Sequence, residues 1–178
     1  MDFFVPCPPT GDSILDSEEI RQQLLDQLMR SRPNADGTGK KEYGGYVYQR
    51  DDGTYFLQPS GDLTATDCGY TLPAGSPPPI SGATALNKAW HTHPSYHGER
   101  LYGCRNAAPN DIVTADRDPK WGGGSERDWE TADTGGPVYI IDLDKNVYRL
   151  DPGTDPSQWG NNPNRWKFYQ SSPCLIHT

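Results

Sequence analysis

Several features that would place a chain in a common class of proteins are missing from this sequence of 178 residues. No apolar run approaches the roughly 20 residues that a membrane-spanning helix needs. Residues 1–6 do not lead from a basic segment into an apolar one, so no Sec signal peptide is visible. We therefore expect a soluble protein without a membrane span, in the cytoplasm unless another route exports it.

Positive charge is also scarce. Lysine and arginine total 16 against 24 aspartates and glutamates, which gives a net charge of −8. Because phosphate binding needs a positive surface, nucleic acid is not expected as the main partner. Cysteine pairs of the C-x-x-C type are absent too, so we expect no cysteine zinc site. The four cysteines allow three complete disulfide pairings, and both the pairing and the redox state stay open: they are Cys7, Cys68, Cys104 and Cys174.

Aromatic residues, glycine and proline are, by contrast, abundant. Five Trp, ten Tyr and four Phe supply enough bulk for a core, whereas 19 Gly and 17 Pro indicate many loops and turns. A chain of this length suffices for one domain and is short for two. We therefore expect a loop-rich domain at 40–150, with an N-terminal extension and helix at 1–39. An aromatic C-terminal tail at 151–178 should pack on the same domain.

The pattern of apolar and turn residues predicts one long helix and five strands. Ser17 can cap the helix, in which Ile20, Leu24, Leu25 and Leu28 form one apolar stripe. The expected strands are Tyr43–Gln49, Thr54–Gln58, Thr84–His93, Pro137–Asp142 and Val147–Leu150, and a short second helix is expected at Asp111–Ala115. This order indicates an α/β, or α+β, fold in which helices flank a mixed sheet.

A cluster of histidines carries the clearest chemical signal. Three of the four histidines in the chain lie within seven residues, at positions 91, 93 and 97. Residues two apart in a strand point to the same face, so His91 and His93 should project side by side. His97 fits a ligand role less well, because the strand should end at Pro94. Two neutral imidazoles completed by a carboxylate are typical of a zinc site, so we predict that His91 and His93 bind Zn²⁺.

The run His91-Thr92-His93-Pro94 resembles the H-[ST]-H-P core of the JAMM/MPN+, or JAB-like, family of zinc metalloproteases. The combination of E-Y-G-G, D-G-x-Y and H-T-H-P is similar to JAMM-like domains at the toxic C-terminal ends of bacterial Rhs and other polymorphic toxins. The resemblance covers residues 40–150. It implies a JAMM or cytidine-deaminase-like mixed sheet flanked by helices.

The resemblance also implies roles for particular residues. In the family, an upstream glutamate acts on the metal-bound water, and the aspartate of an S-x-x-D motif completes the ligands. Glu42 matches the glutamate, which makes it the predicted catalytic base. Asp111 matches the aspartate, which makes it the third predicted metal ligand, with Asp116 and Asp118 as rivals. Ala108 stands where the family has the serine, and loss of one oxyanion-stabilising donor costs about 10²–10³ in rate.

These features imply a zinc-dependent amide hydrolase, a peptidase or isopeptidase, with a protein or peptide as substrate. The similarity to toxin domains further implies a secreted bacterial effector, delivered without a Sec signal, with an immunity or carrier protein as a partner. Two alternatives stay open. A JAMM-type scaffold with a decayed site would bind a partner protein without catalysis, and a metal-dependent toxin could act on a non-peptide substrate.

Overall fold

The structure, a computed structural model, describes residues 9–60, 76–96 and 136–152, together with the backbone of two C-terminal strands. The described elements are one helix and seven strands: α1 (Glu18–Ser31), β1 (Gly44–Arg50), β2 (Tyr55–Pro59), β3 (Ala83–His93), β4 (Val138–Asp142), β5 (Asn146–Leu150), β6 (Arg165–Tyr169) and β7 (Ser172–Ile176). The expected mixture of helix and sheet is therefore confirmed, while the expected short helix at 111–115 lies outside the described residues.

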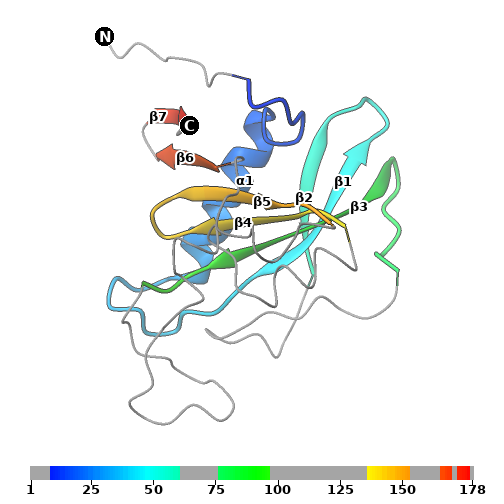
Figure 1. Cartoon of the computed structure of the whole chain (residues 1–178). Helices are drawn as coiled ribbons and strands as arrows, with labels where there is room; N and C mark the ends of the chain where they lie inside the picture. Colours follow the sequence, from blue (N-terminus) through cyan, green and yellow to red (C-terminus); the bar gives the residue numbers. More distant parts are fainter. Residues whose placement is uncertain (1–8, 61–75, 97–135, 153–164, 170–171, 177–178) are drawn as a thin grey trace.

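The strands form one mixed sheet in the order β2-β1-β3-β4-β5-β6-β7 (Figure 1). Five of the neighbouring pairs are antiparallel, whereas β3 and β4 run parallel. The neighbours of β3 in the sheet are therefore β1, which precedes it in the chain, and β4, which follows it. This arrangement places the C-terminal end of β3 between the start of β1 and the end of β4.

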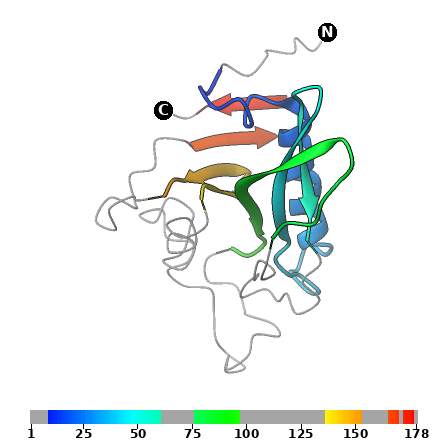
Figure 2. The same cartoon turned by 90° about the vertical axis from the view of Figure 1, so that its right-hand side faces the viewer.

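Helix α1 forms where the sequence combines a capping serine with an apolar stripe. The Ser17 side chain accepts a hydrogen bond from the backbone N–H of Ile20, at 3.4 Å, and two glutamates follow it in the first turn. The stripe residues Ile20, Leu24, Leu25 and Leu28 are all buried, as predicted. Figure 2 shows α1 along one face of the sheet. In the described part of the chain, no helix is both long and apolar enough to cross a membrane.

The two faces of the sheet differ because side chains alternate along each strand. On one face, Trp90 and Tyr139 join the apolar side of α1 in the larger core cluster. On the other face, Val138 and Ile140 form a second apolar cluster with Tyr148 and Leu150 of β5, against which Ala89 packs. A residue of β3 therefore lies on the α1 side when its number is even and on the opposite side when its number is odd, near the end of that strand.

The sheet extends further than the sequence indicated. The tail at 151–178 was expected to pack its aromatic residues on the domain, but its backbone adds two strands: β6 pairs with β5, and β7 pairs with β6. The five expected strands all exist, with ends that differ by at most one residue from those predicted. Cys7, Cys68 and Cys104, like the side chain of Cys174, lie outside the described residues, so the disulfide pairing stays open.

Candidate metal centre

The alternation of β3 presents two histidines on the face opposite α1. Trp90 and Thr92 are fully buried, and Trp90 packs in the core beneath α1. His91 and His93 therefore point the other way, and both are nonetheless buried, with exposed fractions of 8% and 2%. Buried imidazoles normally have hydrogen-bonding or metal-binding partners, since desolvation of a polar ring is costly.

The residue opposite His93 on the neighbouring strand is Glu42. Gly44 pairs with His91 at the start of β1. Beyond that pair, the Thr92 N–H donates to the Tyr43 carbonyl at 2.8 Å, and the Tyr43 N–H donates to Thr92 Oγ1 at 3.0 Å. These bonds continue the antiparallel alignment by two residues, so Glu42 stands across from His93 on the same face. Gly44 adds no side chain beside His91.

The three side chains converge. His91 Nε2 and His93 Nε2 lie 3.0 Å apart, and the two rings are tilted by 45°. A carboxylate oxygen of Glu42 and one nitrogen from each histidine all lie within 4.8 Å of one another. For comparison, two ligands at about 2.0–2.1 Å from one tetrahedral ion stand about 3.3 Å apart. A buried group of two imidazoles and one carboxylate therefore has the spacing and the donor types to hold a metal ion.

A second carboxylate borders this group on the β4 side. The parallel register pairs His91 with Ile140 and His93 with Asp142. Both oxygens of Asp142 accept hydrogen bonds from Asn146, at 3.0 Å from the backbone N–H and at 3.3 Å from the side-chain amide. These bonds close the turn between β4 and β5. Asp142 is thus a neighbour of the site. Its described side-chain hydrogen bonds belong to the turn between β4 and β5.

Two further residues near the site carried no signal in the sequence analysis. Ser95 follows Pro94 at the end of β3 and is buried, with an exposed fraction of 3%. Arg32, just after α1, donates a hydrogen bond from Nη1 to the Pro94 carbonyl at 2.9 Å. The period-2 alternation that identified His91 and His93 would have included Ser95 if it had been continued past the proline.

The structure thus brings together Glu42, His91 and His93, which the sequence analysis singled out. Asp111, the predicted third ligand, lies outside the described residues, as do its rivals and the alanine of the S-x-x-D position: Asp116, Asp118 and Ala108. No protein-family model matches the chain, and no curated protein or solved structure matches it significantly. The function can therefore be inferred only from the site itself.

Proposed function

We propose that the protein is a zinc-dependent amide hydrolase, a peptidase or isopeptidase. The observation that supports this most directly is the buried convergence of the Glu42 carboxylate with the His91 and His93 imidazoles. Stability alone does not require such a group, because apolar residues would fill the same space at a lower desolvation cost. The group has the composition of a catalytic zinc site, in which nitrogen and carboxylate ligands leave one position open.

The proposal gives each residue a part. His91 and His93 bind the ion through Nε2, the atoms that face each other at 3.0 Å. Asp111 supplies the third ligand, an assignment that depends on the resemblance to the JAMM/MPN+ family. A bound Zn²⁺ would lower the pKa of a water ligand towards about 7 and would polarise a substrate carbonyl.

Glu42 is the proton carrier in this proposal. Its carboxylate lies against the two imidazoles and is buried, with an exposed fraction of 7%. From that position it can accept a proton from the attacking water and pass it to the leaving amine. The same proximity also permits a different role, that of a metal ligand, and the two roles predict different metal contents for a Glu42→Gln variant.

A role as a toxic effector domain is part of the proposal and depends on the resemblance alone. It predicts that expression inside a bacterial host slows growth and that Glu42→Gln relieves the effect. The second candidate is a partner-binding scaffold without catalysis, and Ala108 in place of the S-x-x-D serine favours it. A scaffold with a decayed site would purify without metal.

Metal content tests the first half of the proposal. Elemental analysis of the purified protein should find about one zinc per chain after incubation with ZnCl₂ and gel filtration, because a structured site retains its ion. The His91→Ala/His93→Ala variant should retain none, whereas a control variant of the histidine next to the C-terminus, His177→Ala, should retain it. A wild-type protein that binds no zinc would overturn the hydrolase and favour the scaffold.

A Glu42→Gln variant tests the second half. Hydrolysis can be followed by mass spectrometry with a mixed peptide library and a lysine-branched isopeptide library. We expect Glu42→Gln to keep its zinc and to lose at least 10²-fold in turnover, the usual contribution of a general base. Loss of zinc together with turnover would identify Glu42 as a ligand instead. Full turnover in the variant would remove Glu42 from the mechanism.

A further inference from the structure

Ser95 carries a buried hydroxyl that the described part of the fold does not use. Its exposed fraction is 3%, and its Oγ has no hydrogen-bond partner in the structure, as far as the described residues go. Buried hydroxyls are normally paired, because an unpaired one gives up its hydrogen bonds to water and gains none in return. Alanine would fill nearly the same space without that cost, so a serine here points to a partner that the described residues do not supply.

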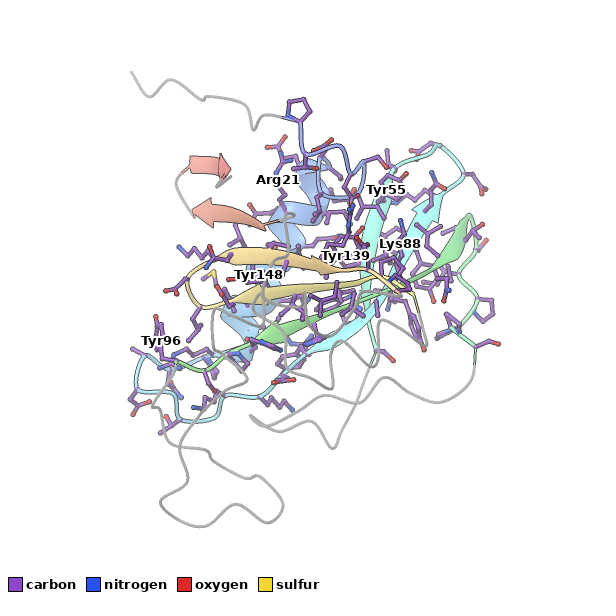
Figure 3. All side chains as sticks on the ribbon, in the orientation of Figure 1. Arg21, Tyr55, Lys88, Tyr96, Tyr139 and Tyr148 are labelled. Carbon is purple, nitrogen blue, oxygen red and sulfur yellow. The ribbon has the colours of Figure 1, made fainter. Side chains whose placement is uncertain are left out.

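The alternation of β3 predicts that the Ser95 side chain lies on the face of the two histidines. Residues 94–96 follow the strand without a turn or bend, so we expect the alternation of β3 to continue through them. Tyr96, labelled beyond the end of β3 in Figure 3, provides an independent check. Its ring lies 5.0 Å from the guanidinium carbon of Arg32, at the C-terminal end of α1, and therefore on the α1 side. Ser95, one residue earlier, points to the opposite side with His91 and His93.

The segment that carries Ser95 is held in place. Arg32 donates one hydrogen bond to the Pro94 carbonyl and another to the Ala35 carbonyl, both at 2.9 Å, while it stacks on Tyr96. The residues on either side of Ser95 are thus both tied to the chain after α1. A donor on a fixed backbone is preorganised, which is what stabilisation of a developing charge requires.

We infer that the Ser95 hydroxyl donates a hydrogen bond to the carbonyl oxygen of a bound substrate amide. The inference rests on the proposed hydrolase function. When the water oxygen bonds to the carbonyl carbon, the π electrons of that carbonyl move to its oxygen, and Ser95 stabilises the resulting charge without losing its proton. The C–N bond then breaks, and the amine leaves with the proton that Glu42 carried. Ser95 would thereby supply a donor in a chain that has Ala108 at the S-x-x-D position.

The test compares two buried serines. Ser95→Ala should lower kcat by about 10²-fold with little change in KM, because the hydrogen bond strengthens as charge develops. Its zinc content should equal that of the wild type. Ser95→Thr, which retains a hydroxyl, should recover most of the loss. Ser31→Ala is the matched control: Ser31 is fully buried and donates to the Leu28 carbonyl at 2.7 Å, so its loss should lower the melting temperature and leave kcat unchanged.

A binding measurement separates this inference from the proposed function. Acetohydroxamate, which carries a carbonyl oxygen and binds metal ions, can be titrated into the Co²⁺-substituted protein and followed by its visible spectrum. We expect the Kd to rise about tenfold in Ser95→Ala, the loss of about one hydrogen bond. An unchanged Kd would overturn the role of Ser95 even in an active enzyme. A raised Kd in a protein that cleaves neither library would support Ser95 and reject the hydrolase.

Discussion

Two buried polar clusters lie on opposite faces of the sheet, and they are built in different ways. Asp12, Tyr139 and Arg149 form the first, on the α1 side, where Tyr139 belongs to the core. Glu42, His91 and His93 form the second. In the first cluster an acceptor is surrounded by donors. In the second, a contact of 3.0 Å joins two imidazole nitrogens, which can share only one proton.

In the first cluster, hydrogen bonds within the fold account for the burial of the Asp12 carboxylate. One oxygen of Asp12 accepts hydrogen bonds from the Tyr139 hydroxyl at 2.7 Å and from Arg149 Nη1 at 2.8 Å. Its other oxygen accepts from the backbone N–H groups of Ile14 and Leu15, at 2.9 and 3.4 Å. Burial alone would raise the pKa of Asp12, but the bonds from Tyr139 and Arg149 outweigh it and hold that pKa below its ordinary value. This cluster fastens the segment before α1 to β4 and β5.

A bound cation would give the second cluster a comparable explanation. A positive ion held by the two Nε2 atoms would turn the imidazoles into ligands and would place its charge close to the Glu42 carboxylate. The comparison therefore teaches that burial of titratable groups is not by itself a sign of function. In the first cluster the complementary charge is part of the described fold, since Arg149 supplies it to Asp12.

The largest loss in the free energy of unfolding should come from breaking the first cluster. Asp12→Asn removes the negative charge that Arg149 and Tyr139 surround, and we expect a loss of about 2–3 kcal/mol in the free energy of unfolding. Urea denaturation measures it. Asp144→Asn, a change of the exposed aspartate in the turn between β4 and β5, should cost little and serves as the control. An equal, small effect of both variants would show that the Asp12 network adds no stability.

The same variant also tests how the contribution of Asp12 to the free energy of unfolding depends on pH. Because the folded-state pKa of Asp12 lies below its ordinary value of 3.8, its ionised form stabilises the fold above that pH. This contribution is lost as the pH falls through the lowered folded-state pKa. The difference in unfolding free energy between wild type and Asp12→Asn should accordingly be constant near neutral pH and shrink below about 3.8. A difference that grows on acidification would contradict the assigned direction.

The sequence alone predicted the helix and the first five strands, but it did not predict the two strands at the C-terminal edge of the sheet. The apolar stripe of α1 and the period-2 runs of β1 to β5 carry strong local signals. Strand β7 contains Pro173, which weakens the local signal for a strand, although an edge strand, its position here, tolerates proline. Strand β6 was missed because its alternating Trp166 and Phe168 were taken as a packed tail.

Some residues of the site could likewise be predicted from a local sequence pattern, and others could not. That His91 and His93 would share a face followed from a local period of two. The position of Glu42 across from His93 depends on the pairing of β1 with β3, residues about 50 apart in the chain, and no local pattern encodes that register. Glu42 was predicted as a site residue only from the resemblance to the JAMM/MPN+ family. Ser95 was overlooked because a proline was assumed to end the alternation as well as the strand.

Metal binding should produce an effect almost as large as the loss of the Asp12 network. Zinc at 100 times its Kd should raise the free energy of unfolding by about 2.7 kcal/mol, because the unfolded chain lacks the assembled site. The His91→Ala/His93→Ala variant should show no such increase. Asp12→Asn should show all of it, since the two clusters lie on opposite faces and share no described contact. A smaller zinc effect in Asp12→Asn would reveal coupling and weaken the comparison.

The smallest expected change in the free energy of unfolding distinguishes the two buried serines, Ser31 and Ser95. Ser31→Ala removes a hydroxyl that donates to the Leu28 carbonyl, and we expect it to lower the free energy of unfolding by about 1 kcal/mol. Ser95→Ala removes a hydroxyl with no partner among the described residues, so the metal-free protein should keep its stability or gain slightly. Urea denaturation of both variants in the presence of a chelator tests the difference. Equal losses would mean that the fold uses the Ser95 hydroxyl itself, and its burial beside the histidines would then need no ligand to explain it.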